Sequence, residues 1–317
     1  MRIFRHDRAQ GPDRGAVVAI GNFDGVHPGH LAVIAKAGAV ARASSAPHAV
    51  LTFEPHPFAV FKPEAPPFRL TPLRAKARLI EQAGVDLLFA IHFDLAFAKK
   101  SAEQFIDEVL VEGLGARHLV IGYDFIFGHR RRGNAATLKS AGAVKGFSVS
   151  VVEPVAGAGG AIYASTSIRA ALAAGRPQDA AALLGRWWEI DGRVEHGEGL
   201  AHGLGSPSAN LPLGDYLRPA PGIYAAFAGI EGDGKTVWHK AVAYLGRRPT
   251  LDPGELRLEA HLLDFTGDLY GRHLRVALVA HLRPDAVLDG KAALAAQIAQ
   301  DVAAARAALA GQKPPAG

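Results

Sequence analysis

The stretch from Ala16 to His30, AVVAIGNFDGVHPGH, constrains the fold more than any other part of the chain. Its first five residues are apolar or small and have the pattern of a buried strand in a parallel sheet. Gly21 ends this run, and the apolar spacing from Leu31 onward predicts a helix. Asn22 to Gly29 is therefore predicted to form a strand-to-helix turn, the place where open α/β sheets bind ligands.

This turn carries two histidines at the start of the predicted helix. The first amides of a helix have no acceptor within the helix and carry partial positive charge, so they favour a phosphate group. Imidazole N–H groups of His27 and His30 are able to stabilise charge on a transferring phosphoryl or nucleotidyl group. Taken alone, each histidine is equally compatible with capping or packing. With the strand before and the helix after, we predict a phosphate-binding turn.

Length and composition indicate two globular domains. The chain has 317 residues, of which 49% are hydrophobic and 21% are charged. It contains no cysteine, which excludes disulfides, thiolate metal sites and cysteine nucleophiles and fits the cytoplasmic location that we expect. Lysine and arginine number 35 against 30 acidic residues, a net charge of +5. That excess suits phosphate-bearing substrates, although a solvated basic surface is the more common explanation for such an excess.

Several classes of protein are not indicated by the sequence. We find no run of about 18 apolar residues of the kind that spans a membrane. The opening residues, MRIFRHDRAQGPDR, have no apolar core of a signal peptide. Basic residues are not interleaved with aromatic ones in a nucleic-acid motif. We therefore expect neither nucleic-acid nor membrane partners, and a monomer or a weak homo-oligomer.

Short apolar strands alternate with helical patterns through the first half of the chain, which predicts a parallel sheet with helices on both faces. This Rossmann-like α/β domain is predicted to occupy residues 1–184. Its strands are predicted at Ala16–Gly21, Ala49–Phe53, Asp86–His92, His118–Gly122 and Phe147–Val152. Its helices are predicted near Leu31–Ala43, Pro72–Ala83, Ser101–Leu114 and Ala135–Val144.

Three further segments place polar or aromatic residues where strands end. In LTFEPHP the chain must leave the sheet at Pro55, which makes His56 a candidate substrate contact or a packed loop residue. In VIGYDFIFGHRRRGN, aromatic residues beside glycine are able to sandwich a planar ring, and the arginines are able to meet phosphates. In YASTSIR, the hydroxyls of Ser165–Ser167 and the cation of Arg169 suggest a second phosphate cradle, although serine and threonine caps are common.

The pattern changes after residue 184. Short strand-like runs separated by glycine, proline and aspartate turns predict a small antiparallel β-barrel in residues 185–317. An alanine-rich amphipathic helix from Lys291 is expected to pack on it. Only the final segment, GQKPPAG, is predicted to be disordered.

The first half resembles a known family. GNFDGVHPGH resembles the phosphate-binding turn of HIGH-type nucleotidyltransferases, and TFEPHP and TSIR are similar to segments of the bacterial bifunctional riboflavin kinase/FMN adenylyltransferase (FAD synthetase) family. The resemblance implies that His27 and His30 stabilise the transition state as the FMN phosphate attacks the α-phosphorus of ATP. The implied ATP contacts are Gly21, Asn22, Phe23, Asp24, Ser165, Thr166, Ser167 and Arg169. The implied flavin contacts are His56, Asp124, Phe125 and Phe127.

The second half resembles the riboflavin kinase module of that family. The similar segments are HGEGLAHGLGSPSANL, PGIYA, LGRRPT, LEAHLLDF and GDLYG. The resemblance implies that Glu259 acts as base on the riboflavin 5′-hydroxyl, that Ser208 and Asn210 bind Mg-ATP, and that Arg248 contacts the flavin. Hydroxyl and amide oxygens are hard ligands of the type that Mg²⁺ prefers. The implied cofactor is Mg²⁺, and the implied substrates are ATP, riboflavin and FMN.

The chain departs from the family pattern at several positions. In the kinase half, His202, Ser206, Ser208 and Tyr244 stand where the family usually has arginine, phenylalanine, threonine and asparagine. In the first half, Ile126 stands where arginine is common and Ala164 replaces a serine. Two alternatives therefore stay open beside the bifunctional enzyme. One is an adenylyltransferase with an inactive kinase half, and the other is a non-enzymatic flavin- or nucleotide-binding paralogue.

Overall fold

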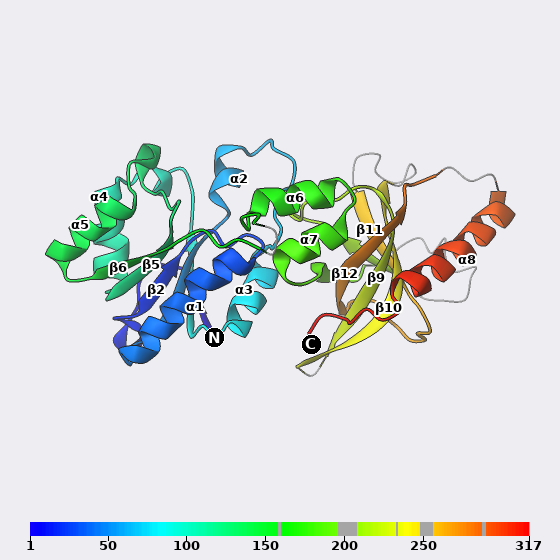
Figure 1. Cartoon of the computed structure of the whole chain (residues 1–317), viewed down its shortest axis with the longest axis horizontal. Coiled ribbons are helices and arrows are strands. Elements are labelled where there is room, and N and C mark those ends of the chain that lie inside the picture. Colours follow the sequence, from blue (N-terminus) through cyan, green and yellow to red (C-terminus); the bar gives the residue numbers. More distant parts are fainter. Residues whose placement is uncertain (158–159, 196–207, 233, 248–255, 287–289, 317) are drawn as a thin grey trace. The chain divides into compact units, whose positions relative to one another are not determined.

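The structure is a computed structural model, and it describes residues 1–157, 160–195, 208–232, 234–247, 256–286 and 290–316. Contacts divide the chain into two compact units, each with its own sheet and hydrophobic core (Figure 1). The first unit comprises Met1–Pro66 and Thr71–Ala164, and the second comprises Pro67–Leu70 and Ser165–Gly317.

The first unit is built on a six-stranded sheet in which every pair of neighbouring strands is parallel. The order across the sheet is β1-β4-β3-β2-β5-β6. Its strands are β1 (Arg2–Phe4), β2 (Val17–Ile20), β3 (His48–Glu54), β4 (Leu87–His92), β5 (His118–Gly122) and β6 (Ser148–Val152). The predicted parallel sheet is therefore confirmed, and β1 is an additional edge strand that the sequence analysis missed.

Helices cover both faces of this sheet because its buried strands are apolar on both sides. Val18 and Ile20 of β2 face one core, whereas Val17 and Ala19 face the other. The helices are α1 (Pro28–Ala43), α2 (Pro57–Phe61), α3 (Leu73–Gln82), α4 (Ala102–Gln104), the π-helical η3 (Phe105–Gly113) and α5 (Ala135–Lys145), with short 3₁₀ turns η1 (Gly11–Asp13), η2 (Phe97–Lys99) and η4 (His129–Arg131).

Two helix starts differ in detail from the prediction. α1 begins at Pro28, three residues before the predicted start, because proline is favoured in the first turn and His27 caps the helix. Pro72 precedes α3 as its N-cap instead of opening it, and the neighbouring Thr71 bonds to the turn after β2. The helix predicted from Ser101 begins with a capping box, in which Ser101 and Gln104 each accept a hydrogen bond from the other's backbone N–H.

The second unit is built on an antiparallel six-stranded sheet in the order β7-β12-β9-β10-β11-β8. The sheet curls, and an isolated bridge between Glu195 and Asn210 links the end of β7 to β8. The strands are β7 (Trp188–Arg193), β8 (Ser208–Pro212), β9 (Gly222–Gly232), β10 (Lys235–Arg247), β11 (Leu256–Leu262) and β12 (His273–Arg283). This curled antiparallel sheet confirms the predicted β-barrel class of fold.

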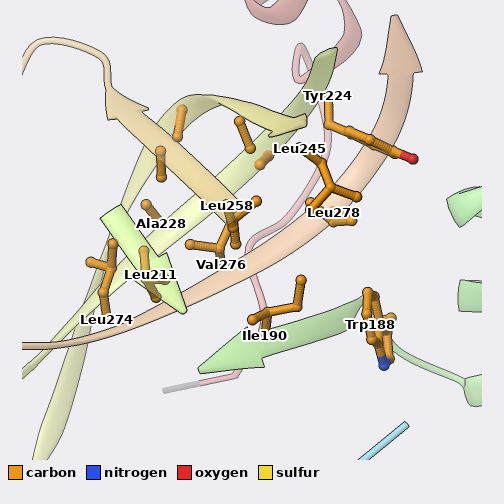
Figure 2. Packing of buried hydrophobic residues seen from close by; sticks show 14 of the residues in the cluster. Trp188, Ile190, Leu211, Tyr224, Ala228, Leu245, Leu258, Leu274, Val276 and Leu278 are labelled. Carbon is orange, nitrogen blue, oxygen red and sulfur yellow. The ribbon is translucent and has the colours of Figure 1, made fainter. Parts of the chain in front are cut away.

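Alternate residues of these strands fill the inside of the curled sheet. All six strands contribute side chains to one core, including Ile190, Leu211, Ala228, Leu245, Leu258 and Val276 (Figure 2). Trp188 is fully buried in the same core, and its indole Nε1 donates a hydrogen bond to the Leu70 carbonyl at 2.9 Å. This bond ties the segment Pro67–Leu70 to the second unit.

Three helices complete the second unit. Buried residues of α6 (Ser165–Ala173) and α7 (Pro177–Leu184) join the core inside the sheet. The boundary that we predict between residues 184 and 185 stays a prediction, while the contacts group these two helices with the second unit. The C-terminal helix α8 (Gly290–Ala308) packs on the outer face of β9 and β12, as predicted.

The expectation of a disordered C-terminal segment was wrong for the residues that the structure describes. The indole Nε1 of Trp187 donates to the carbonyl of Lys313 at 3.1 Å, and Nη2 of Arg275 donates to the carbonyl of Ala316 at 3.4 Å. The polar, proline-containing tail has no core of its own. Its backbone is bound instead by side chains distant in sequence, from Trp187 just before β7 and from Arg275 on β12.

A buried ion pair lies beneath this tail. Arg275 donates from Nε to Glu189 at 2.7 Å and from Nη2 at 3.2 Å, and both side chains are almost fully buried. Arg275 also donates to Thr236 at 3.0 Å and lies 4.9 Å from the centre of the Trp238 ring. Breaking such a pair leaves one charge without compensation, whereas removing both charges does not.

We expect Glu189→Met and Arg275→Met, made singly, each to destabilise the second unit by about 3–5 kcal/mol. The double variant is expected to lose less than the sum of the two single losses, because neither charge is then left alone. Urea unfolding of the three variants measures this difference. Strictly additive losses would contradict the role that we assign to the pair.

Candidate active sites

The sheet order of the first unit brings three of the predicted site segments to the same end of the sheet, where the strands finish. β2 lies between β3 and β5, and all three strands run parallel, so their carboxyl ends meet. The turn with His27 follows β2, Pro55–Pro57 follows β3, and Tyr123–Phe127 follows β5. After β2 the chain forms β3 and β4 on one side of β2, and it then crosses to form β5 and β6 on the other side. The carboxyl ends of β2 and β5 therefore form a topological switch point, where such sheets bind ligands.

The turn between β2 and α1 has an unusual backbone. Phe23 and Val26 adopt φ values of 48° and 43°, a left-handed region that non-glycine residues rarely occupy. Each such residue costs of order 1–3 kcal/mol and persists only where its surroundings hold it. Both side chains are 1% exposed, so their burial in the core beside α1 stabilises the strained turn.

Asp24 helps to hold this turn. Its Oδ1 accepts hydrogen bonds from the backbone N–H of Thr71 at 3.0 Å and from the Thr71 hydroxyl at 3.4 Å. The hydroxyl oxygen of Thr71 accepts in return from the Gly25 N–H at 2.8 Å. Asp24 is only 2% exposed, so the structure gives this predicted ATP contact a structural role in the turn.

His27 and His30 form one stacked pair at the start of α1. Their ring centroids lie 3.6 Å apart with an interplanar angle of 20°. Nδ1 of His27 accepts a hydrogen bond from the His30 N–H at 3.4 Å, so a neutral His27 carries its proton on Nε2. A Cβ atom on Gly29 would lie 3.2 Å from the His27 ring, which explains the glycine between the histidines.

His56 lies two residues after the end of β3 and is the N-cap of α2. Its Nδ1 accepts from the Phe58 N–H at 3.1 Å, and the side chain is 9% exposed. The same argument as for His27 places the proton of a neutral His56 on Nε2. Phe58 and Phe61 of α2 are exposed next to it in the sequence. His56 therefore has a capping role, and its predicted contact with a flavin stays a prediction.

The loop after β5 separates the remaining predicted flavin contacts. Asp124 is exposed and Phe125 is half-buried, whereas Phe127 is 8% exposed and belongs to the core. The rings of Phe125 and Phe127 stack with centroids 5.6 Å apart. Ile126, at the position where the family commonly has arginine, is exposed. A planar ligand would meet Phe125 on this side more readily than the buried Phe127.

The segment Ser165–Arg169 belongs to the second unit and opens α6. Thr166 and Ser167 are exposed, and Ser165 is half-buried. Nε of Arg169 donates to the Phe68 carbonyl at 2.9 Å, and its guanidinium carbon lies 5.3 Å from the centre of the Phe68 ring. These contacts hold the arginine side chain in place. A role in binding phosphate stays a prediction.

Strand register brings the predicted kinase residues together. Asn210 on β8 pairs with Glu259 on β11, and Glu259 pairs with Tyr244 on β10. Ser208 pairs with His261 two residues further along the same two strands. The residues between them, Ala209 and Ala260, face the core, so Ser208, Asn210, Glu259 and His261 share the opposite face of the sheet.

Tyr244 lies on this same face of the sheet, because its neighbours Ala243 and Leu245 face the core. Its hydroxyl donates to Oδ2 of Asp285 at 2.8 Å. Its ring lies over Gly246, where an added Cβ atom would come within 2.0 Å of the Tyr244 hydroxyl. This departure from the family pattern is therefore accommodated by a glycine and an aspartate. His202, Ser206 and the predicted flavin contact Arg248 lie outside the described residues.

The sequence analysis missed three residues of the first site and one of the second. Thr52, Thr71 and Lys76 all bond to the turn after β2. In the sequence, Lys76 could have been recognised as a buried lysine because it lies among the apolar residues Ala75, Ala77 and Ile80 of α3. The signal for His261 was the alternation of β11, which puts it two residues beyond Glu259.

Comparisons with known proteins agree with this arrangement. The family model described as FAD synthetase matches residues 9–166, and the model described as riboflavin kinase matches residues 184–309. The bifunctional riboflavin kinase/FMN adenylyltransferase of Escherichia coli K12 is 39% identical over 96% of this chain and 97% of its own length. The chain belongs to the bifunctional riboflavin kinase/FMN adenylyltransferase family. A relative of the same name from Pseudomonas fluorescens is 42% identical over 93% of each chain.

A solved structure supports the fold of this family member. A crystal structure titled macrolide-efflux protein from Streptococcus pneumoniae covers 96% of this chain and 98% of its own, with 28% identity and a TM-score of 0.82. The described residues of this family member contain no helix long and apolar enough to cross a membrane. They also contain no cluster of three histidine, aspartate or glutamate side chains placed to hold a metal ion.

His261, on the face shared with Asn210 and Glu259, makes the folding stability of the protein depend on pH. Burial lowers the pKa of its imidazole below the usual 6.5, and its cross-strand neighbours, Ser208 and Val242, carry no charge. The unfolded chain therefore binds this proton at a higher pH than the folded chain does. The stability that neutral His261 contributes is present above pH 6.5 and is lost as the pH falls through its folded-state pKa.

We expect the melting temperature of the wild-type protein to fall more between about pH 7 and about pH 5 than that of His261→Gln, because glutamine does not titrate. Differential scanning calorimetry at both pH values measures the two losses. An equal loss in the two proteins would show that His261 does not contribute to this dependence.

Proposed function

We propose that this protein converts riboflavin and ATP to FMN and ADP, and then FMN and ATP to FAD and pyrophosphate. Both activities appear in the names of relatives that match nearly the whole chain. One observation carries the proposal in the first unit: the stacked pair of His27 and His30 at the switch point, at the start of a 16-residue helix. In the second unit, the facing of Asn210 and Glu259 supports the kinase reaction.

The first unit is proposed to transfer the adenylyl group. An oxygen of the FMN phosphate attacks the α-phosphorus of ATP, and the bond from that phosphorus to pyrophosphate breaks. The proton on Nε2 of His27 and the Gly29 N–H at the start of α1 are proposed donors for the charge that develops on the phosphorus oxygens. Pro28 has no N–H, and the His30 N–H already bonds to Nδ1 of His27. His30 stacks on His27 and fixes its orientation while contributing its own ring nitrogen. In this unit, Asn22–Asp24 are proposed to contact ATP; in the second unit, Ser165–Arg169 are proposed as a separate phosphate-binding segment.

The second unit is proposed to transfer a phosphoryl group. Glu259 is half-buried and faces Asn210 across the strand pair. As a base it accepts the proton of the riboflavin 5′-hydroxyl while that oxygen attacks the γ-phosphorus of ATP. Arg248 is proposed to contact the flavin. The altered kinase motif leaves an inactive second unit as the rival reading.

Kinase and adenylyltransferase reactions generally need a divalent metal, and we propose Mg²⁺. The hydroxyl of Ser208 and the amide oxygen of Asn210 lie on one face of β8 and are hard oxygen donors, so they fit this ion. When bound, Mg²⁺ neutralises charge on the phosphates of ATP. We further propose a cytoplasmic location and a monomer or weak homo-oligomer, with no nucleic-acid partner.

The experiment that tests both activities is chromatography of the flavins after incubation with ATP and Mg²⁺, once from riboflavin and once from FMN. FAD from both reactions supports the bifunctional enzyme. FAD from FMN alone would mean that the second unit has lost its chemistry. Flavin binding without either product would support a non-enzymatic paralogue.

We expect replacement of both His27 and His30 by alanine to lower the rate of FAD formation from FMN by about 10²–10³ or more, because transition-state donors are lost. FMN formation from riboflavin by the same preparation is the control for folding and should not change. Unchanged FAD synthesis would contradict the assignment of the two histidines.

Glu259→Gln is expected to lower FMN formation by about 10²–10⁴, because glutamine cannot accept the proton of the 5′-hydroxyl. FAD formation from added FMN should persist at the wild-type rate, since Glu259 has no proposed role in adenylyl transfer. The two rates are measured by the same chromatographic assay. A kinase rate within twofold of the wild type would remove Glu259 from the mechanism.

A further inference from the structure

A lysine lies fully buried beneath the turn of the first unit. Lys76 is in the middle of α3 and is 0% exposed. A buried ammonium group is costly unless polar atoms surround it, so a chain that keeps one in its core has a specific use for it. None of the roles proposed above uses Lys76.

The ammonium group of Lys76 binds the backbone just after β2. Its Nζ donates to the carbonyl of Asn22 at 2.7 Å and to the hydroxyl oxygen of Thr52 at 3.4 Å. That hydroxyl in turn donates to the same Asn22 carbonyl at 3.1 Å. Two donors from different elements thus converge on one carbonyl oxygen.

The held carbonyl controls the direction of the next amide. The peptide bond between Asn22 and Phe23 is trans, so its C=O and N–H point in opposite directions. Because Lys76 draws the carbonyl into the protein interior, the Phe23 N–H is aimed away from the ammonium group. Phe23 is also the first of the two residues that the turn holds at positive φ. Releasing the carbonyl would therefore release the strained part of the turn.

We propose that Lys76 is a positioning residue for adenylyl transfer. It fixes the Asn22 peptide so that the turn presents N–H groups, and not a carbonyl oxygen, to the phosphates of ATP. This inference rests on the proposed adenylyltransferase function of the first unit. It assigns Lys76 an indirect role, through Asn22, in binding and orienting ATP.

The main test replaces the charge and keeps the side-chain stem, with Lys76→Met. Because a misplaced binding group typically costs about 10²-fold, we expect kcat/KM for ATP in FAD formation to fall roughly 10- to 100-fold. FMN formation from riboflavin, in the same preparation, is expected to stay within about twofold. Lys36→Met is the matched control, since Lys36 lies exposed on α1 and loses the same charge.

Rescue separates the charge from packing. The chain contains no cysteine, so Lys76→Cys introduces a single thiol. Alkylation of that thiol with bromoethylamine in denaturant, followed by refolding, forms a carbon–sulfur bond, releases bromide and restores an ammonium group on a stem of lysine length. We expect the alkylated protein to regain at least about a third of the wild-type FAD formation rate. Alkylation with 1-iodopropane adds similar bulk without a charge or a hydrogen-bond donor and should not rescue.

The outcomes distinguish this inference from the proposed function. If the wild-type protein makes no FAD from FMN, the proposed function and the role of Lys76 both fall. If the wild type makes FAD and folded Lys76→Met makes it equally well, only the inference is overturned. Parallel loss of both reactions, or rescue by 1-iodopropane, would overturn it as well, because each indicates packing alone.

A second variant keeps the test decisive if Lys76→Met does not fold. Thr52→Val preserves the shape of the side chain and removes the other donor to the Asn22 carbonyl. We expect a smaller loss of FAD formation, of about 3- to 10-fold, with the kinase rate unchanged. No selective loss in Thr52→Val would overturn the claim that the Asn22 carbonyl must be held.

Discussion

The first unit depends on the hydrogen bonds that hold the strained turn between β2 and α1. Phe23 and Val26 are in the left-handed region, and a chain would leave that conformation if nothing opposed it. Their buried side chains and the polar contacts from Thr52, Thr71 and Lys76 oppose it together. The start of α1, and with it the stacked histidine pair, is therefore fixed by residues outside the turn.

In the second unit the corresponding constraint is the register of the antiparallel strands. Because side chains alternate between the faces of a strand, the pairing that puts Ala209 and Ala260 into the core also puts Asn210 and Glu259 on the opposite face. A slip of one residue would turn the two polar side chains toward the core and the two alanines toward the opposite face. The hydrophobic core inside the curled sheet therefore also aligns the proposed kinase residues.

Departures from the family pattern are easier to judge in the structure than in the sequence. Tyr244 looked like a disruption of the kinase half, yet its ring lies over Gly246 and its hydroxyl binds Asp285. Conversely, Phe127 matched the family pattern and is buried against Phe105 and Phe125. Matching a motif thus identifies a position, whereas burial decides which of its atoms a ligand can reach.

Sequence by itself determined the local elements: the strand before Gly21, the helix after His27, the alternation around Glu259 and the two-part organisation of the chain. These features depend on neighbouring residues, whose spacing is visible in one dimension. Only the tertiary structure decided that β2 lies between β3 and β5, and that Thr71 and Lys76 bind a turn 47 and 54 residues away. Long-range pairing depends on how whole elements pack, so no local pattern of residues reveals it.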